Sequence, residues 1–170
     1  QGKGTDLARD RIKELLRRAY LKYGSDFYIL QCDIQGYYKN MRHDIVAASF
    51  ERRLPSGILK RTMDVLGTQY KGDVGYDPGS QMVQIAGISF LDKFDHFVKE
   101  TLRRKAYMRY MDDFFIVGKT AEELKNVLVE IQKYLGFIGL TVHPKKTRIF
   151  HQKAKMKILG FSFYVTKTAQ

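Results

Sequence analysis

The sequence contains a single cysteine, Cys32, among its 170 residues. A lone cysteine excludes an internal disulfide and is typical of proteins that work in a reducing compartment. No apolar run approaches the roughly 18–20 residues that a membrane-spanning helix needs, and no signal peptide opens the chain. These absences argue against a disulfide scaffold and against a membrane protein, and we expect a cytoplasmic location.

Acidic residues are scarce relative to basic ones, with 18 Asp and Glu against 30 Lys and Arg, which gives a formal net charge of +12. A protein this basic attracts polyanions, of which nucleic acid is the usual one. A membrane surface is the alternative, but basic membrane anchors concentrate their charge on one amphipathic helix. Here the basic residues are spread along the chain, which disfavours a membrane anchor. Separately, a hydrophobic content of 44% predicts one folded domain.

Two adjacent carboxylates, Asp112 and Asp113, stand between two runs of strand-forming residues, 107–111 and 114–117. Such runs, separated by two turn-tolerant residues, predict a β-hairpin with the Asp pair at its tip. Like charges this close repel unless a cation lies between them, and Mg²⁺ and Mn²⁺ prefer carboxylate oxygen. The simpler alternative is that Asp is common in turns because it tolerates unusual backbone angles.

A third carboxylate, Asp33, ends the mostly apolar run 27–33, which predicts a buried central strand. Three carboxylates on two neighbouring strands are suited to holding two divalent ions for phosphoryl transfer. The alternative is that Asp33 only caps the next element. A further strand-like segment, 158–163, follows a Lys-Lys-Thr-Arg segment and contains Gly160. The occurrence of all three features in this order argues against a chance arrangement.

The rest of the sequence predicts helices separated by turns. Thr5 is suited to capping a helix that stops near Gly24, and the Thr120–Glu123 capping box opens a helix that ends near Gly139. Further elements are expected as helices over 43–53, 56–69 and 80–104, a turn-rich loop over 71–79, and strands over 146–151 and 157–165. The 80–104 helix is expected to bury a stripe made of Ile85, Ile88, Leu91, Phe94, Phe97, Val98 and Leu102.

In chain order the predicted elements are strand, helices, strand, strand, helix, strand. This order is the split βαβ arrangement of the ferredoxin-like fold. We therefore expect an α+β protein whose antiparallel sheet has helices packed on one face. Such a sheet brings the end of the Asp33 strand beside the Asp112 hairpin, which supports a metal site there.

With these motifs in hand, the chain resembles the palm region of reverse transcriptases of the bacterial non-LTR type, found in group II introns, retrons and diversity-generating retroelements. The resemblance rests on segments that together cover nearly the whole chain: Gly2-Lys3-Gly4-Thr5 with Ala8, Cys32-Asp33-Ile34-Gln35-Gly36-Tyr37-Tyr38, Pro78-Gly79-Ser80-Gln81-Met82-Val83-Gln84, Arg109-Tyr110-Met111-Asp112-Asp113, His143-Pro144-Lys145-Lys146-Thr147 and Ile158-Leu159-Gly160-Phe161. The resemblance implies a single palm domain over 1–170, in which 1–26 belongs to the part next to the fingers and most of the fingers and the thumb are absent.

The resemblance implies attack of a primer 3′-hydroxyl on the α-phosphorus of an incoming dNTP, assisted by two Mg²⁺ ions that Mn²⁺ can replace. Asp33 and Asp112 are expected to bind both ions, and Asp113 to be the third catalytic carboxylate. The backbone carbonyl of Ile34 is expected to hold the ion on the nucleotide side. One ion would lower the pKa of the hydroxyl and the other would stabilise the pyrophosphate.

The same resemblance assigns Tyr38, Gln81, Gln84 and Lys146 to nucleotide binding. Tyr38 is expected to exclude a ribose 2′-hydroxyl, unless it is a core aromatic and Tyr37 is the exposed one. Which glutamine contacts nucleotide stays open, because Met82 and Val83 replace the small hydroxylated residues common in the family, and a helix-capping role for Ser80 or Gln81 is the alternative.

Primer and template contacts are assigned to the catalytic hairpin and to the primer grip, where a glycine lets the backbone approach closely. An ordinary strand glycine at a bulge is the alternative for Gly160. The residues assigned to these contacts are Tyr110, Met111, Leu159, Gly160 and Phe161.

The expected function is that of an RNA-directed DNA polymerase, and the expected partners are an RNA template, a DNA primer, dNTP and a structured cognate RNA. The isolated chain is expected to have little activity and to self-associate through apolar surface that fingers and thumb would cover. The alternative is a non-catalytic nucleic-acid-binding scaffold, which has no use for three crowded acids. A palm-fold nucleotide cyclase is disfavoured because its Gly-Gly-Asp/Glu-Glu-Phe hairpin is absent.

Overall fold

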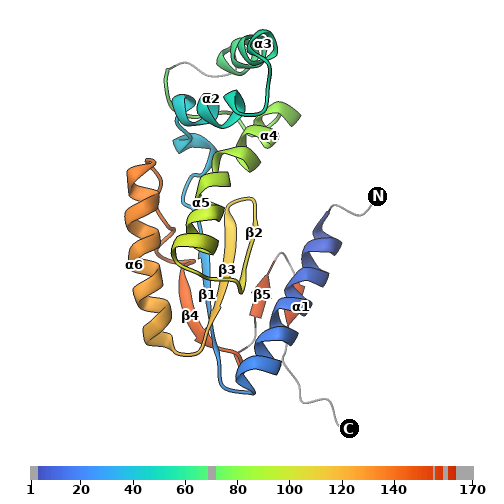
Figure 1. The fold of residues 1–170 in the computed structure, drawn as a ribbon, viewed down its shortest axis with the longest axis vertical. Coiled ribbons are helices and arrows are strands. Elements are labelled where there is room, and N and C mark those ends of the chain that lie inside the picture. The colour runs from blue at the N-terminus through green and yellow to red at the C-terminus, as the bar shows by residue number, and fades with distance from the viewer. Residues whose placement is uncertain (1–3, 69–71, 155, 159–160, 164–170) are drawn as a thin grey trace.

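The computed structural model describes residues 4–68, 72–154, 156–158 and 161–163. Its centre is a four-stranded antiparallel sheet in the order β2-β3-β1-β4 (Figure 1). The strands are β1 (Tyr28–Asp33), β2 (Tyr107–Tyr110), β3 (Asp113–Gly118) and β4 (Arg148–His151). The sheet confirms the predicted hairpin and the predicted central position of the Asp33 strand.

One face of the sheet is covered by α5 (Asp92–His96) and α6 (Ala121–Phe137). Alternate strand residues point to this face, and Leu30, Phe114 and Ile116 are fully buried there. Phe94 of α5 packs edge-on against Phe114 with ring centroids 5.3 Å apart. The predicted α+β fold, with an antiparallel sheet and helices packed on it, is confirmed.

The opposite face is covered by α1 (Thr5–Tyr23), so the sheet has helices on both sides and not on one face as predicted (Figure 1). Ile12 and Leu16 of α1 are buried against Phe115 and Val117 of β3. Gly24 ends α1 as predicted, with a φ of +67°. The N-cap is Gly4 rather than Thr5, which is the first residue of the helix.

The C-terminal part of the described chain differs from the prediction of one strand over 157–165. It contains two short strands, β5 (Met156–Ile158) and β6 (Phe161–Phe163), which pair antiparallel as a separate two-stranded sheet. Phe163 is buried with the α1 residues on the second face of the main sheet. A run of apolar residues does not reveal a reversal inside it, which is why the sequence reads as one strand.

Three helices gather beyond the end at which β1 stops, uppermost in Figure 1: α2 (His43–Glu51), α3 (Ser56–Gly67) and α4 (Gln81–Phe90). Pro55 separates α2 from α3 as predicted. The short 3₁₀ turn η1 (Tyr38–Asn40) connects β1 to this group. Thr120 caps α6, accepting a hydrogen bond from the Glu123 amide at 3.1 Å, as the capping box predicts.

The single helix predicted over 80–104 is wrong. It is divided into α4, α5 and the π-helical turn η2 (Phe97–Thr101), which ends before Arg103 adopts a φ of +53°. Ile85 and Ile88, predicted to be buried, are 55% and 54% exposed. α4 instead buries Val83, Ala86, Gly87, Ser89 and Phe90, and glycine is favoured at position 87 because a Cβ there would lie 3.0 Å from the Tyr38 ring.

Within the described residues, no helix is both long and apolar enough to span a membrane.

Candidate active site

Strand pairing brings Asp33 and Asp113 directly opposite each other at one end of the sheet. They are Cα partners in the antiparallel register of β1 with β3. Asp112 lies in the adjoining turn, and its carbonyl accepts a hydrogen bond from the Ile34 amide at 3.2 Å. The three predicted carboxylates therefore lie together at this end of the sheet, which is called the acidic end below. Asp33 lies far from the other two in the sequence, and the strand pairing brings them together.

The tip of the hairpin is shifted by one residue from the prediction. Asp113 is the first residue of β3 and pairs with Tyr110, so the two-residue turn consists of Met111 and Asp112. Met111 has a φ of +56°, an unusual conformation for a residue with a side chain. Holding Asp113 in the strand fixes its position relative to Asp33.

Burial and mutual repulsion change the proton affinity of the acidic end. Burial, with added repulsion from Asp112 and Asp33, raises the pKa of Asp113 to about 6. Burial also raises the pKa of Asp112, and the charge of Asp33 contributes in the same direction. Lys146 opposes both shifts. Negative charge is thus concentrated where a cation would relieve it.

Lys146 lies at the acidic end, and its Nζ is 2.9 Å from Oδ2 of Asp33. The turn that carries Lys146 is attached to β1, because the His143 amide donates to the Asp33 carbonyl at 2.7 Å. The Asp33 hydrogen bond raises the pKa of Lys146, whose side chain is 60% exposed. Lys146 therefore contacts a carboxylate of the acidic end, and its predicted binding of nucleotide stays a prediction.

The acidic end fits divalent ions in the kind of donor that it offers. Carboxylate oxygens are the ligands that Mg²⁺ and Mn²⁺ prefer, and the raised pKa values of Asp112 and Asp113 reflect charge that such ions would offset. Within the residues that the structure describes, no three His, Cys, Asp or Glu side chains are grouped as a ready-made metal centre. The roles of these carboxylates and of the Ile34 carbonyl as ligands stay predictions.

The two tyrosines after β1 differ in environment. Tyr37 is 3% exposed, and its hydroxyl donates a hydrogen bond to the Gly87 carbonyl of α4. Tyr38 is only partly buried, and burial together with the charge of Asp112 raises its pKa. Tyr37 is thus the core aromatic and Tyr38 the one beside the acidic end, whereas the role of Tyr38 in sugar selection stays a prediction.

Gln81 and Gln84 are both exposed on the first turns of α4. Ser80 is the helix cap, since its side chain accepts a hydrogen bond from the Val83 amide at 3.2 Å. The capping alternative is therefore confirmed for Ser80 and not for Gln81. Across the described chain, neither glutamine side chain makes a hydrogen bond to the acidic end, so their nucleotide contacts stay predictions.

The predicted primer and template residues are only partly described. Tyr110 lies at the end of β2, and Met111 lies in the hairpin turn directly beside Asp112. Phe161 begins β6. Leu159 and Gly160 lie outside the described residues. The contacts of all these residues with primer or template stay predictions.

A buried ion pair that was not expected from the sequence supports the turn formed by Met111 and Asp112. The Arg109 side chain is only 9% exposed and forms two hydrogen bonds with Asp95 of α5, at 2.8 and 2.7 Å. Arg109 also donates to the Met111 carbonyl at 3.0 Å, and Tyr107 donates to Asp95 at 2.5 Å. A charged residue inside an apolar hairpin strand is a signal that it needs a buried partner, although it does not say which acid that partner is.

Solved telomerase structures match the fold of this chain over nearly its whole length. The apo telomerase of Candida tropicalis, truncated from its C-terminal domain, matches with a TM-score of 0.70 and 18% identity over 96% of this chain. The Candida albicans telomerase, in complex with a fragment of telomeric RNA, matches with a TM-score of 0.69 and 14% identity over 94%. At these identities the likeness concerns the fold alone.

The family is shown by the sequence itself. The family model for reverse transcriptase (RNA-dependent DNA polymerase) matches residues 6–163. The chain therefore belongs to the reverse transcriptase family. It spans 39% and 32% of the two telomerase chains. No curated protein matches the chain, and the bacterial non-LTR subgroup stays a prediction.

Proposed function

We propose that this chain is the catalytic palm of an RNA-directed DNA polymerase that adds dNTP to a primer 3′-hydroxyl on an RNA template. The observation that carries the proposal is the direct pairing of Asp33 with Asp113, with Asp112 in the adjoining turn. A scaffold that only bound nucleic acid would gain nothing from partly burying two acids whose pKa values are raised by burial and by the charge of neighbouring carboxylates.

Asp33, Asp112 and Asp113 are the residues that would hold two Mg²⁺ ions, for which Mn²⁺ can substitute. When bound, such ions activate the attacking hydroxyl and stabilise the leaving pyrophosphate. With a pKa of about 6, Asp113 is mostly ionised at pH 7 and above. Lys146 supplies positive charge beside Asp33, where a triphosphate would add negative charge.

The residues around the acids would position the substrates. Tyr38 presents a partly exposed ring near Asp112 and would stand against a ribose 2′-hydroxyl. Arg109 fixes the backbone of the turn through the Met111 carbonyl. Most of the rate enhancement would come from such positioning and from fixed charges, as in other phosphoryl transfers.

The proposed partners are an RNA template, a DNA primer, dNTP and a structured cognate RNA, to which the net charge of +12 is suited. The subgroup that we propose is the bacterial non-LTR type, on the motifs quoted above. The buried, unpaired Cys32 is consistent with a cytoplasmic location. Low activity of the isolated chain is part of the same proposal.

Metal binding tests the proposal without requiring turnover. We expect Mn²⁺ to bind the chain in about the millimolar range or tighter, a free energy of at least about 4 kcal/mol, measured by calorimetry and paramagnetic NMR broadening. The Asp112→Asn/Asp113→Asn variant should lose this binding. A matched control, Asp64→Asn/Asp77→Asn, removes two exposed carboxylates elsewhere and should keep it.

Two outcomes would favour the scaffold alternative. One is the absence of Mn²⁺ binding by the unmodified chain even with primer–template and dNTP present. The other is binding that both double variants lose equally, since that would reflect general negative charge. If binding is specific, primer extension by a longer form of the protein, with and without the Asp112→Asn change, would test catalysis directly.

A further inference from the structure

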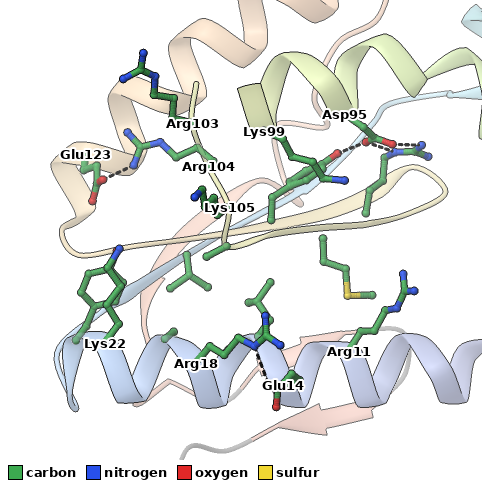
Figure 2. Close-up of a pocket in the computed structure, with 18 residues that line it drawn as sticks. Arg11, Glu14, Arg18, Lys22, Asp95, Lys99, Arg103, Arg104, Lys105 and Glu123 are labelled. Atoms are coloured by element: carbon green, nitrogen blue, oxygen red, sulfur yellow. Dashed lines mark hydrogen bonds and ion pairs between the residues drawn. The ribbon is translucent and has the colours of Figure 1, made fainter. Parts of the chain in front are cut away.

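A basic cleft lies between α1 and β2, away from the three carboxylates. It encloses about 970 Å³, and its walls come from α1, from β2 and from the segment that joins η2 to β2 (Figure 2). Asp33, Asp112 and Asp113 do not line it. β2 is an edge strand of the described sheet, so the cleft follows the outer edge of the fold.

The acidic residues of the basic cleft are neutralised by arginines. Glu14 pairs with Arg18 at 2.6 Å, and Asp95 pairs with Arg109 at 2.7 Å. The remaining acid, Glu123, forms an ion pair with Arg104, drawn as a dashed line in Figure 2. None of the acids in the cleft is therefore left to attract cations or to balance further basic residues.

Five further basic residues line the cleft, and all of them are exposed. Among the described residues, none of the five has an acidic partner. Lys22 lies over the ring of Tyr23 at 5.0 Å, and Lys99 lies over the ring of Tyr107 at 5.8 Å. These five residues are Arg11, Lys22, Lys99, Arg103 and Lys105.

Five unbalanced positive charges around one cavity repel one another, and a bound polyanion would relieve that repulsion. The walls are fixed, because Ile12 and Leu16 anchor α1 to the sheet and β2 is paired with β3. The backbone walls of the cleft are thus formed before any ligand arrives, which reduces the cost of reorganisation on binding.

We propose that the basic cleft binds the sugar–phosphate backbone of a single-stranded nucleic acid at a site separate from the catalytic carboxylates. Arginine and lysine suit phosphate oxygens, and the Tyr23 ring on the wall offers a surface on which a base can stack. A cavity near the upper end of the roughly 300–1,000 Å³ range of ligand pockets takes a few nucleotides of one strand and not a double helix.

Other anionic partners fit the cleft less well. A membrane surface would require α1 to present an apolar face, and that face is buried against the sheet. An acidic polypeptide has the right charge but offers no planar base for Tyr23. We expect nucleic acid to bind the cleft without metal ions. The inference therefore does not depend on the proposed polymerase function, which requires metal ions at the acidic end.

The test compares two triple variants of equal charge. Arg11→Gln/Arg103→Gln/Lys105→Gln removes exposed cleft charges, and the control Lys60→Gln/Arg61→Gln/Lys153→Gln removes exposed charges elsewhere. Binding of fluorescein-labelled 20-nucleotide oligouridylate is followed by anisotropy in EDTA over a salt series, with an oligodeoxythymidylate of equal length as the second arm. Urea unfolding of each protein checks that it is folded.

The cleft variant should bind oligouridylate at least tenfold more weakly than the control variant. The slope of log K against log salt should fall by about 2, at roughly 0.7 per lost phosphate contact on a single strand. An equal loss for oligodeoxythymidylate indicates recognition of the shared phosphate backbone, and a loss for RNA alone indicates that the ligand is RNA. Equal weakening by cleft and control variants would overturn the proposal.

Two further readouts locate the ligand. Photo-crosslinks from 4-thiouridine in the same RNA should map to Tyr23 or to the 103–109 segment. Crosslinks confined to the α2–α4 group would overturn the proposal. Displacement of the RNA by polyglutamate, at lower concentrations than unlabelled oligouridylate needs, would also overturn it in favour of an acidic protein partner.

Discussion

The charge of Asp113, and with it the stability of the fold, depends on pH. Its carboxyl has a pKa of about 6 in the fold, against an ordinary value of 3.8, because burial and the neighbouring Asp112 and Asp33 disfavour its charge. The folded state therefore holds this proton more tightly than the unfolded chain does. The resulting stabilisation is complete below the unfolded pKa and is lost as the pH rises through the folded pKa.

Asp113→Asn should consequently stabilise the protein at pH 8 and not at pH 4. A pKa difference of this size corresponds to at most about 3 kcal/mol, and contact with solvent should reduce the gain in unfolding free energy to about 1–2 kcal/mol. Urea unfolding at the two pH values measures it. Asp77→Asn, which removes an exposed carboxylate, should change stability little at either pH.

A gain for Asp113→Asn that is the same at pH 4 and pH 8 would contradict this explanation, because a pH-independent effect cannot come from ionisation. Added Mn²⁺ provides a second check. It should stabilise the unmodified protein at pH 8 and lose that effect as the pH falls below about 6, where Asp113 takes up its proton.

At the scale of elements, the Arg109–Asp95 pair joins β2 to α5 and holds the turn that carries Asp112. Burial opposes the charge of Arg109, but the hydrogen bonds and charge of Asp95 raise the pKa of Arg109 above its ordinary value. Removing either partner leaves the other charge buried without compensation, which is the costly way to break an ion pair.

Arg109→Met should lower the unfolding free energy by about 2–4 kcal/mol, and Asp95→Asn should have a comparable cost. The double variant should cost less than the sum of the two, by about 1 kcal/mol or more, in a double-mutant cycle measured by urea unfolding. Mn²⁺ affinity at the acidic end should fall with Arg109→Met, because the Met111 carbonyl loses its donor.

The exposed pair Lys133–Glu130 on α6, at 2.7 Å, is a matched control, and Lys133→Met should cost less than about 1 kcal/mol. Strict additivity of the Arg109 and Asp95 effects, or an unchanged Mn²⁺ affinity in Arg109→Met, would show that the pair does not hold the turn.

The elements also show what the sequence could and could not predict. The hairpin and the Asp33 strand were predictable because alternating or continuous apolar residues ended in charged ones, and the pairing of the strands then placed the acids together. The residue at the hairpin tip was not predictable, because Met111 adopts a positive φ that its own preferences disfavour.

The expected 80–104 helix differs from the structure because of packing between elements that are distant in the sequence. Ile85 and Ile88 continue a regular apolar stripe, yet the buried side of α4 is the one that carries Gly87 and Ala86. Close packing against Tyr37 and Tyr38 selects small residues there, and hydrophobicity alone does not report such packing. The Arg109–Asp95 pair escaped prediction for a similar reason, since the partner lies on a different element.

At the scale of the whole molecule, apolar surface is concentrated at the α2–α4 end. Ile58, Ile85 and Ile88 are each more than half exposed, and Ile58 and Ile85 line an open apolar hollow of about 290 Å³. Isolated exposed hydrophobic residues are ordinary, whereas a contiguous group of this kind marks a surface that tends to be covered.

We expect the isolated chain to self-associate weakly through this end. Ile85→Ser/Ile88→Ser should shift sedimentation-velocity profiles towards monomer at concentrations where the unmodified chain associates. Val129→Ser/Phe137→Ser removes exposed apolar side chains from α6 and should leave association unchanged. An unmodified chain that is monomeric at high concentration, or an equal effect of both variants, would refute the prediction.

The position of β1 in the sheet has a consequence for how the chain is made. β1 is the first of the described strands in chain order, yet its neighbour β3 follows α2–α5 and its other neighbour β4 follows α6. During translation the edge of β1 that pairs with β3 therefore remains open until β3 has been made, and the edge that pairs with β4 remains open until nearly the last described strand has left the ribosome. Open strand edges pair readily with other chains, and distant strand pairing is slow. Nascent chains of this protein should thus depend on chaperones that shield β1 until the sheet closes around it.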